Sequence, residues 1–462
     1  MLKFPSPVEV YINNRRFGKH FNPDWIRTFA VAVLVAGMSQ SAAAATFYVN
    51  PGGTIQAAVD KASAGDTIQV APGTYFEDVI IGKSLSLVGA GHGRSIINAM
   101  GLPIGIWIDG IDHPNPRLSN VVVTGFTIEN ANFEGILVTN ASFITIFENE
   151  VINNDKSLIF PPTGPPECPG IPGFETNEGF DCGEGIHLSG VDHSVVSNNT
   201  SKHNAGGILL SDDTGATHDN LITGNVVMNN PFDCGITLAS HPPASPPAPQ
   251  PSPTPFGVFD NTIAENESSS NGLAVEGAGA GVGLFAPGPG NKVYANVVIN
   301  NELKDNGLPG VALHNHVVAP MDTPAVNLND NLIAGNRISG NGADTEDAET
   351  PGPTGINVFG VAPITGTIIS GNVIDDEAVD IATNTPAQVN VHLNNLLGGQ
   401  IGVDNLDSGT VDATENWWGS PRGPGTGGAT TVNGNVSYTP WLSHPIQGLH
   451  PKETPVNWCQ SY

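Results

Sequence analysis

The sequence predicts an all-β protein whose chain winds into a single parallel β-helix. Short apolar segments with period-2 alternation recur along almost the whole chain, and helical periodicity is nearly absent. Glycine and asparagine separate these segments at regular positions. Uninterrupted copies lie 26 residues apart between Asn199 and Asn225, and 21 apart between Asn395 and Asn416. That spacing is too short for a β-α-β unit and typical of one solenoid coil, so we expect about a dozen or more coils.

The first recurring pattern is an apolar residue, two variable positions, Asn, one variable position and a second apolar residue. It occurs from Ile146 to Val151 and from Ile222 to Val227. Stacked coils repeat at about 4.8 Å, so we expect each Asn to occupy a turn, where it tolerates a left-handed backbone, and to bond to the Asn above and below. The expected column comprises Asn149, Asn199, Asn225, Asn266, Asn296, Asn336 and Asn372, with looser copies at Asn395 and Asn416.

The second pattern is Gly, apolar, variable, apolar, and it alternates with the first. It begins at Gly135, Gly185, Gly207, Gly235 and Gly355. We expect Gly185, Gly207 and Gly235 to stack in three successive coils, because their spacing follows the repeat.

Charge and composition exclude several classes of protein. The 462 residues include 44 acidic and 16 basic ones, which gives a net charge of −28. This excess disfavours a nucleic-acid partner, which needs a basic face, and disfavours attraction to an anionic membrane. A disordered or collagen-like chain is excluded by the 39% hydrophobic content.

The first 45 residues have the layout of a secretory signal peptide. Basic residues precede an apolar segment from Phe29 to Met38, and small residues follow up to Ala45. About ten apolar residues are too few to span a bilayer, so we expect cleavage and no transmembrane segment in the mature chain. Cleavage would remove five bases and two acids, leaving 42 acids, 11 bases and a net charge of −31. The expected location is therefore the exterior, the periplasm or the cell surface.

Four cysteines make disulfide bonds plausible in an exported chain: Cys168, Cys182, Cys234 and Cys459. Three pairings are open, and we favour Cys168 with Cys182, which would close a loop rich in proline and glycine.

Longer gaps in the repeat indicate inserted loops, among them 155–182 and the proline-rich 241–256. The repeat resumes at Asn261, which favours one β-helix domain over 46–442 and a C-terminal tail over 443–462.

The N-terminal segment from Thr54 to Gly91 resembles the opening of pectin-lyase-like right-handed parallel β-helix proteins. The segment from Asn416 to Pro421, with Tyr438 to Leu442, is similar to the closing segment of many exported bacterial members. The resemblance implies a right-handed helix of coils with a short amphipathic capping helix before the first coil. It implies no particular activity, because the fold carries lyases, hydrolases, esterases, epimerases and proteins without activity.

Catalytic motifs of this fold are not matched. Polygalacturonases place an Asp-Asp pair before Gly-His-Gly, whereas here Gly91-His92-Gly93 precedes Asp212-Asp213. The paired-Asp and Gly-Arg-Pro-Trp motifs of pectin methylesterases are absent, and so is the Asp-Pro-His-Asp run of alginate epimerases. No recognisable lyase motif surrounds the few basic residues.

Aligning the Gly strands nevertheless brings acids and histidines into adjacent coils beside the loops 155–182 and 241–256. Such a group is the candidate site. We expect catalytic carboxylates at Glu184, Asp212, Asp213 and Asp233, and substrate contacts at His187 and His203. Paired carboxylates serve as acid and base in glycoside hydrolysis, and alternatively they hold calcium. The competing interpretation is that these are ordinary turn and surface residues.

Two further features have a structural interpretation. The run Asp375-Asp376-Glu377 with Asp380 is typical of a solvated turn. Trp417-Trp418 suits a cover for the last coil, because solenoid ends need capping.

Three functions remain open from the sequence. The first is binding or processing of a polysaccharide, a neutral one rather than a polyuronate because the chain is strongly acidic. The second is a non-catalytic surface, scaffold or adhesin-like protein. The third is a periplasmic accessory role in copper-enzyme maturation, which is disfavoured because the five Met, the Cys and the His form no cluster in the sequence.

Overall fold

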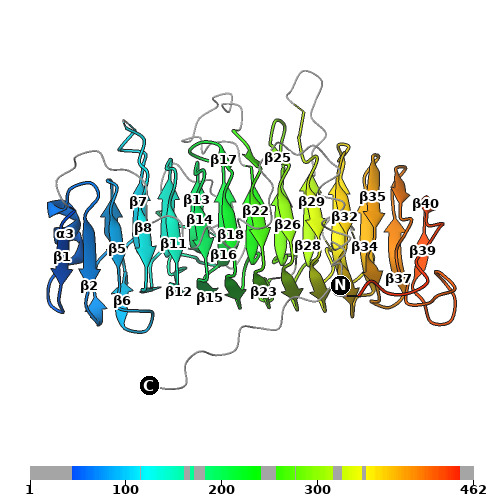
Figure 1. Cartoon of the computed structure of the whole chain (residues 1–462), viewed down its shortest axis with the longest axis horizontal. Coiled ribbons are helices and arrows are strands. Elements are labelled where there is room, and N and C mark those ends of the chain that lie inside the picture. Colours follow the sequence, from blue (N-terminus) through cyan, green and yellow to red (C-terminus); the bar gives the residue numbers. More distant parts are fainter. Residues whose placement is uncertain are drawn as a thin grey trace, which may run out of the picture.

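The fold is a stack of β-coils that advances in sequence order along the long axis (Figure 1). The computed structural model describes residues 44–114, 116–160, 167–170, 183–240, 256–275, 277–315, 325–345 and 350–447. Most of the expected signal peptide and most of the expected tail therefore lie outside the described residues, and their assignments stay predictions.

Three long parallel sheets form the faces of the stack. Sheet A contains β1 (Thr46–Val49), β2 (Thr67–Val70), β5 (Ser86–Val88), β8 (Val122–Thr124), β11 (Thr145–Phe147), β14 (Val195–Ser197), β18 (Leu221–Thr223), β22 (Thr262–Ala264), β26 (Val297–Ile299), β29 (Leu332–Ala334), β32 (Ile368–Ser370), β35 (Gln388–His392), β38 (Thr410–Asp412) and β40 (Val436–Ser437). Sheet B contains β3 (Gly73–Tyr75), β6 (Ser95–Asn98), β9 (Thr127–Glu129), β12 (Glu150–Ile152), β15 (Thr200–Lys202), β19 (Val226–Met228), β23 (Glu267–Ser269), β27 (Glu302–Lys304), β30 (Arg337–Ser339), β33 (Val373–Asp375) and β36 (Asn395–Leu396).

Sheet C contains β4 (Val79–Ile81), β7 (Ile106–Asp109), β10 (Ile136–Thr139), β13 (Glu184–Ser189), β16 (Gly206–Ser211), β20 (Ile236–Ala239), β24 (Val282–Phe285), β28 (Val311–Asn315), β31 (Thr354–Gly360), β34 (Val379–Asn384), β37 (Ile401–Asn405) and β39 (Thr431–Asn433). A short sheet joins β17 (Thr217–His218), β21 (Val258–Phe259) and β25 (Val293–Tyr294). The fourteen strands of sheet A confirm the expected number of coils, and the all-β fold class is confirmed.

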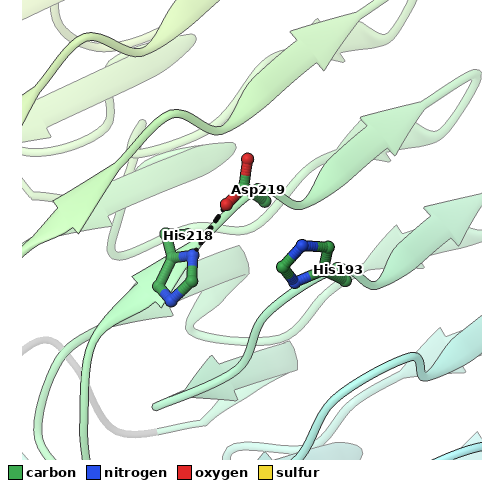
Figure 2. Close-up of side chains that lie close together, drawn as sticks. All are labelled: His193, His218 and Asp219. Atoms are coloured by element: carbon green, nitrogen blue, oxygen red, sulfur yellow. Dashed lines mark hydrogen bonds and ion pairs between the residues drawn. The ribbon is translucent and has the colours of Figure 1, made fainter. Parts of the chain in front are cut away.

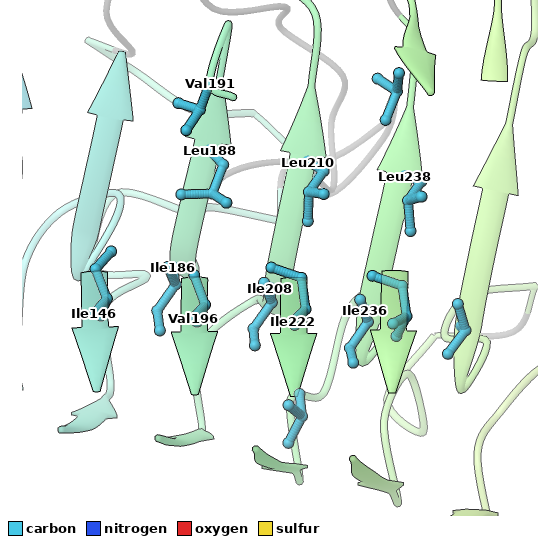
Figure 3. Close-up of a cluster of buried hydrophobic side chains, with 14 of the residues drawn as sticks. Ile146, Ile186, Leu188, Val191, Val196, Ile208, Leu210, Ile222, Ile236 and Leu238 are labelled. Carbon is cyan, nitrogen blue, oxygen red and sulfur yellow. The ribbon is translucent and has the colours of Figure 1, made fainter. Parts of the chain in front are cut away.

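Rows of aliphatic side chains run along the interior of the stack (Figure 3). Ile186 pairs in register with Ile208, which pairs with Ile236, and each follows one of the stacked glycines. The expected stacking of Gly185, Gly207 and Gly235 is thereby confirmed. Burying one such side chain contributes roughly 1.5–3 kcal/mol, so the repeated core row is a main source of stability.

Three asparagine ladders, one at each corner of the coil, hold the turns in place. In the ladder before sheet B, Asn199 and Asn225 each donate their backbone N–H and side-chain Nδ2–H to the next Asn Oδ1 at 2.9–3.0 Å. The observed members are Asn149, Asn199, Asn225, Asn266, Asn301, Asn336, Asn372, Asn394 and Asn416.

Two expected members of that column were wrong. Asn296 belongs to the ladder before sheet A, between Asn261 and Asn331, and Asn394 occupies the position expected for Asn395. The left-handed backbone occurs not at the ladder Asn itself but at the residue directly before it. Glu148 and Asn198, for example, have φ of 54° each.

One helix is found in the described residues, α3 (Ile55–Lys61), at the N-terminal end of the stack (Figure 1). Its buried Ile55 and Val59 face the first coil. The Glu77 carboxylate accepts the backbone N–H groups of Ile55 and Gln56 at 2.7 and 3.0 Å, which satisfies the helix N-terminus. The expected capping helix is confirmed. No helix in the described part of the chain is long and apolar enough to cross a membrane.

The other end of the stack contains the expected tryptophans. Trp418 is fully buried and belongs to the main core, with Trp441 packed against that core. The chain stays attached beyond residue 442, because Ile446 exchanges two hydrogen bonds with the Asn395 side chain.

Sheet C differs from the other two sheets in the burial of its outward side chains. Strands β14 and β15 alternate between half-buried and buried residues, as expected for a solvated outer face. By contrast, every residue of β13, β16 and β31 is buried. The outward side chains of these three strands are therefore shielded from water, which raises the energetic cost of any unpaired polar group there.

Candidate functional site

Two glutamates and a histidine meet on the outer face of sheet C. His187 lies between the core residues Ile186 and Leu188 in β13, so its side chain faces outward. The possible ligand atoms of Glu134, Glu184 and His187 lie within 4.8 Å of one another. The three side chains are 0%, 1% and 3% exposed.

Stacked glycines position the two glutamates. Each glutamate directly precedes a Gly, in Glu134-Gly135-Ile136 and Glu184-Gly185-Ile186. A Cβ at Gly135 would collide with the Val151 side chain, and one at Gly185 with Ser201 Oγ. These positions therefore require glycine, because each points into the crowded corner of the coil. The sequence analysis did not include Glu134 in the candidate site. The Glu-Gly-Ile triplet that it shares with Glu184 could have identified it.

A hydrogen-bonded chain supports His187 from the neighbouring coil. His187 Nε2 lies 2.8 Å from Ser211 Oγ, and Ser211 Oγ donates a short hydrogen bond to Asp213 Oδ2. Asp213 is thus connected to the predicted site through Ser211 and His187. On the other side of the ring, His187 Nδ1 lies 3.8 Å from Glu134 Oε1.

Asp212 has different hydrogen-bond partners from Asp213. Its Oδ2 accepts a hydrogen bond from Ser240 Oγ at 2.9 Å and from the Gly257 backbone N–H at 2.6 Å. The side chain is fully buried and joins the two segments that flank residues 241–255. These bonds indicate a structural role for Asp212.

Asp233 and His203 end up in different environments. Asp233 Oδ2 and Glu184 Oε1 lie 3.3 and 3.4 Å from the position that a Cβ on Gly206 would take, so the two carboxylates flank that glycine. His203 is exposed in a left-handed corner position before Asn204. Within the described chain, His203 is not among the residues whose ligand atoms cluster.

The cysteines are resolved only in part. Cys168 is disulfide-bonded, but Cys182 lies outside the described residues, so their pairing stays a prediction. Cys234 is buried and free. Burial, followed by the neighbouring Asp233 charge, raises the pKa of the Cys234 thiol well above its usual value.

The run from Asp375 to Asp380 was predicted as a solvated turn, and this prediction was wrong for two of its residues. Glu377 is 3% exposed and Asp380 fully buried. Glu377 takes the place of an Asn at the end of a corner ladder, where its Oε1 accepts the backbone N–H and the Nδ2–H of Asn341 at 3.0 and 2.9 Å. Burial raises the pKa of Glu377 to about 7, despite these bonds, and raises that of Asp380 well above its usual value.

A further polar group lies on the same face of sheet C. His314 Nε2 is 3.2 Å from Asp344 Oδ2 and 3.3 Å from Asn357 Nδ2, and the three side chains are buried. Acid-base groups thus occur at two places along the outer face of sheet C.

An exposed group lies at the corner between sheets C and A. Figure 2 shows His193 and His218 side by side, with Asp219 next to His218; their possible ligand atoms lie within 4.8 Å of one another. His218 Nδ1 is 2.8 Å from Asp219 Oδ2, and His193 Nδ1 is 2.8 Å from Asp192 Oδ1. Burial opposes ionisation of Asp192, but the His193 hydrogen bond and the Arg117 charge together hold its pKa below the usual value.

These two histidines belong to a row of neighbouring rings, some stacked and others tilted or edge-on, which we call the ring row. His218 and Phe259 stack at 4.9 Å with an interplanar angle of 7°, and Phe259 and Tyr294 stack at 5.0 Å and 13°. The full row comprises Phe143, His193, His218, Phe259 and Tyr294. The histidine cluster could not be found by spacing alone, because it forms between coils.

Comparisons with known proteins agree with this architecture. Residues 90–242, which are 153 of the 462, match the family model described as periplasmic copper-binding protein (NosD). No curated protein matches the sequence. Among solved structures, PfbA, a surface adhesin of Streptococcus pneumoniae, is 14% identical, with a TM-score of 0.50 over 84% of this chain and 86% of that one. Together with the parallel sheets, this likeness shows that the chain has a parallel β-helix fold.

A second solved structure covers a similar share of the chain. The A-module of the Azotobacter vinelandii mannuronan C-5 epimerase AlgE6 is 16% identical, with a TM-score of 0.49 over 85% of this chain and 95% of that one. Identities this low show a shared fold alone. The function of this chain therefore has to be argued from its own residues.

Proposed function

We propose that this chain is an exported β-helix protein that binds and processes polysaccharide on the outer face of sheet C. Glu184 and Asp233 would be the reacting carboxylates. His187 would contact the substrate, and Asp213 would position His187 through Ser211. Asp212 is left out of the machinery, because its hydrogen bonds to Ser240 and Gly257 assign it a structural role.

The observation that supports this proposal is the pair of carboxylates on either side of Gly206. Both oxygens lie within 3.4 Å of one point, so they are at most twice that distance apart. Glycoside hydrolysis uses two carboxyl groups roughly 5–9.5 Å apart, one as acid and the other as base or nucleophile. Since Gly206 has no side chain, none stands between the two carboxylates.

The charge of the chain favours a neutral glycan. At a net charge of −28, an anionic polyuronate would be repelled over most of the surface. Neutral chains experience no such repulsion, so we expect the best substrate among neutral polysaccharides.

The test is a panel of neutral and uronic polysaccharides incubated with the purified protein, with reducing ends measured as the product. We expect turnover of at least one neutral glycan and its loss in Asp233→Asn. The matched control is Asp305→Asn, which makes the same change at an exposed corner position. Binding without turnover would favour a non-catalytic, adhesin-like role. Neither binding nor turnover across the panel would overturn the proposal.

A second candidate function is a periplasmic accessory protein that handles copper. It is supported by the match of residues 90–242 to the copper-binding family model and by the His193, His218 and Asp219 group within those residues. Imidazole is a ligand that suits Cu(II), and the carboxylate of Asp192 orients His193 as metal-bound histidines require. The expectation from sequence that no His cluster exists is corrected by this group.

Copper titration separates the two candidates. The accessory role predicts that His218→Ala loses one Cu(II) equivalent relative to wild type and that Asp233→Asn loses none. Copper binding that is indifferent to His218 would remove this candidate.

A further inference from the structure

The strongest unassigned feature is the buried group of Glu134, Glu184 and His187. Two carboxylates and an imidazole come together where the side chains are 0%, 1% and 3% exposed. Like charges this close and this far from water are costly unless a positive charge lies among them. Among the described residues, the ion-pair partner of Glu134 is His187, at 3.8 Å.

The hydrogen-bonded chain behind His187 determines which ring nitrogen carries a proton. Ser211 gives its single hydroxyl proton to the Asp213 carboxylate, so its oxygen must accept the bond from His187 Nε2. Nε2 is therefore protonated. In the neutral imidazole, Nδ1 then presents a lone pair on the side where the glutamates lie.

Three atoms of Glu134 and His187 on that side lack hydrogen-bond partners. Both carboxylate oxygens of Glu134 and Nδ1 of His187 are buried without a hydrogen bond. A second proton on the ring would not satisfy them, since 3.8 Å is too long for an N–H to O hydrogen bond. A cation between Nδ1 and the carboxylates would satisfy the imidazole and Glu134 together.

We propose that Glu134, Glu184 and His187 bind one divalent transition-metal cation of the zinc type. Zinc takes His nitrogen and carboxylate oxygen at about 2.0–2.2 Å, so two ligand atoms on one ion lie roughly 3.4 Å apart. The 3.8 Å between Nδ1 and Glu134 Oε1 is close to that separation. Calcium takes six to eight oxygens and does not favour imidazole, so the nitrogen ligand argues for zinc, manganese or iron.

Ser211 and Asp213 act as the outer support of this site. A metal-bound histidine almost always donates its other N–H to a fixed acceptor, which sets the tautomer and the ring orientation. His187 Nε2, Ser211 and Asp213 provide that support. The site goes beyond the proposed glycan chemistry and does not require it, although Glu184 and His187, with the supporting Ser211 and Asp213, belong to both.

The test uses the full protein carrying His193→Asn, which removes one ligand of the exposed histidine group and suits the left-handed position. After chelation and dialysis, Zn²⁺ and Ca²⁺ are titrated separately by calorimetry, and Co²⁺ is added as an optical probe. We expect one equivalent of Zn²⁺, a visible Co²⁺ spectrum, a higher Tm with Zn²⁺ and much weaker Ca²⁺ binding.

Two variants locate the metal in the chain. Glu134→Gln keeps the shape of the side chain but loses the charge, and it should abolish Zn²⁺ binding and the Co²⁺ spectrum. Ser211→Ala should weaken binding by roughly 10–100-fold, the usual cost of losing an outer partner. The matched control is Glu148→Gln on the exposed corner, which should change nothing.

Several results would overturn the proposal. They are no Zn²⁺ binding by the His193→Asn protein, Ca²⁺ binding as tight as Zn²⁺, and full binding by Glu134→Gln. The first two need no further substitution, so they decide the question even if Glu134→Gln fails to fold. Glycan turnover is measured separately, so failure of the proposed function leaves the metal result intact.

Discussion

Glu377 should make the stability of the C-terminal coils depend on pH. Burial raises its pKa from the usual 4.5 to about 7, with the charges of Asp376 and Asp375 adding to the effect. A carboxyl with a raised pKa holds its proton more tightly in the folded state than in the unfolded chain. Its contribution to stability is therefore complete below pH 4.5 and is lost as the pH rises through about 7. A shift of this size corresponds to about 3 kcal/mol.

The substitution Glu377→Gln removes this dependence. The amide oxygen of Gln can accept the same two bonds from Asn341, and the amide does not titrate. Relative to wild type, we expect the free energy of unfolding of the variant to rise by about 3 kcal/mol between pH 4.5 and pH 8. Any pH-independent cost of the amide cancels in that difference.

The assay is urea unfolding at the two pH values, followed by the fluorescence of the tryptophans at this end of the stack. Trp418 is fully buried, so its emission reports loss of the surrounding coils. The control is Glu415→Gln, an exposed carboxyl at a corner position of the same end. Identical pH dependence in wild type and Glu377→Gln would refute the reasoning.

Two further predictions concern the coil corners. Asn225→Ala should lower the free energy of unfolding by about 3–6 kcal/mol, because it leaves several buried backbone and side-chain groups of adjacent coils without partners, at about 1–3 kcal/mol each. The half-buried Asn390→Ala should cost less than 1 kcal/mol by the same urea assay; equal losses would contradict the ladder argument. Gly185→Ala should cost about 1–3 kcal/mol through the clash with Ser201, whereas Gly215→Ala, where a Cβ meets only ordinary contacts, should lower the Tm little. If Gly185→Ala lowers the free energy of unfolding no more than Gly215→Ala does, the predicted clash with Ser201 is absent.

The repeat, the parallel strands and the terminal caps could be predicted from sequence because each coil places similar residues at similar spacing. The assignment of asparagines to corners could not. Asn220, Asn225 and Asn230 occupy the three corners of one stretch of chain, five residues apart. Since all three corners use the same residue, a shift by one corner fits the pattern equally well, and this is how Asn296 was assigned in place of Asn301.

The candidate site was predictable only in part. Glu184 and His187 could be found because they adjoin a Gly strand, but Glu134 lies before a long insertion and its pairing with them depends on register across it. The competing interpretation treated these groups as turn and surface residues, whereas every residue of β13 is buried. Glu377 was misjudged for a similar reason, because it replaces an Asn within a buried ladder.

The central claim is that the outer face of sheet C is where the protein engages its glycan. Hydrogen–deuterium exchange with and without the best-bound oligosaccharide tests this directly. We expect added protection in peptides that contain Glu184 to Ser189 and Gly206 to Asp213, and no change in peptides confined to the strands of sheet B. Protection restricted to sheet B, or to the ring row, would contradict the account.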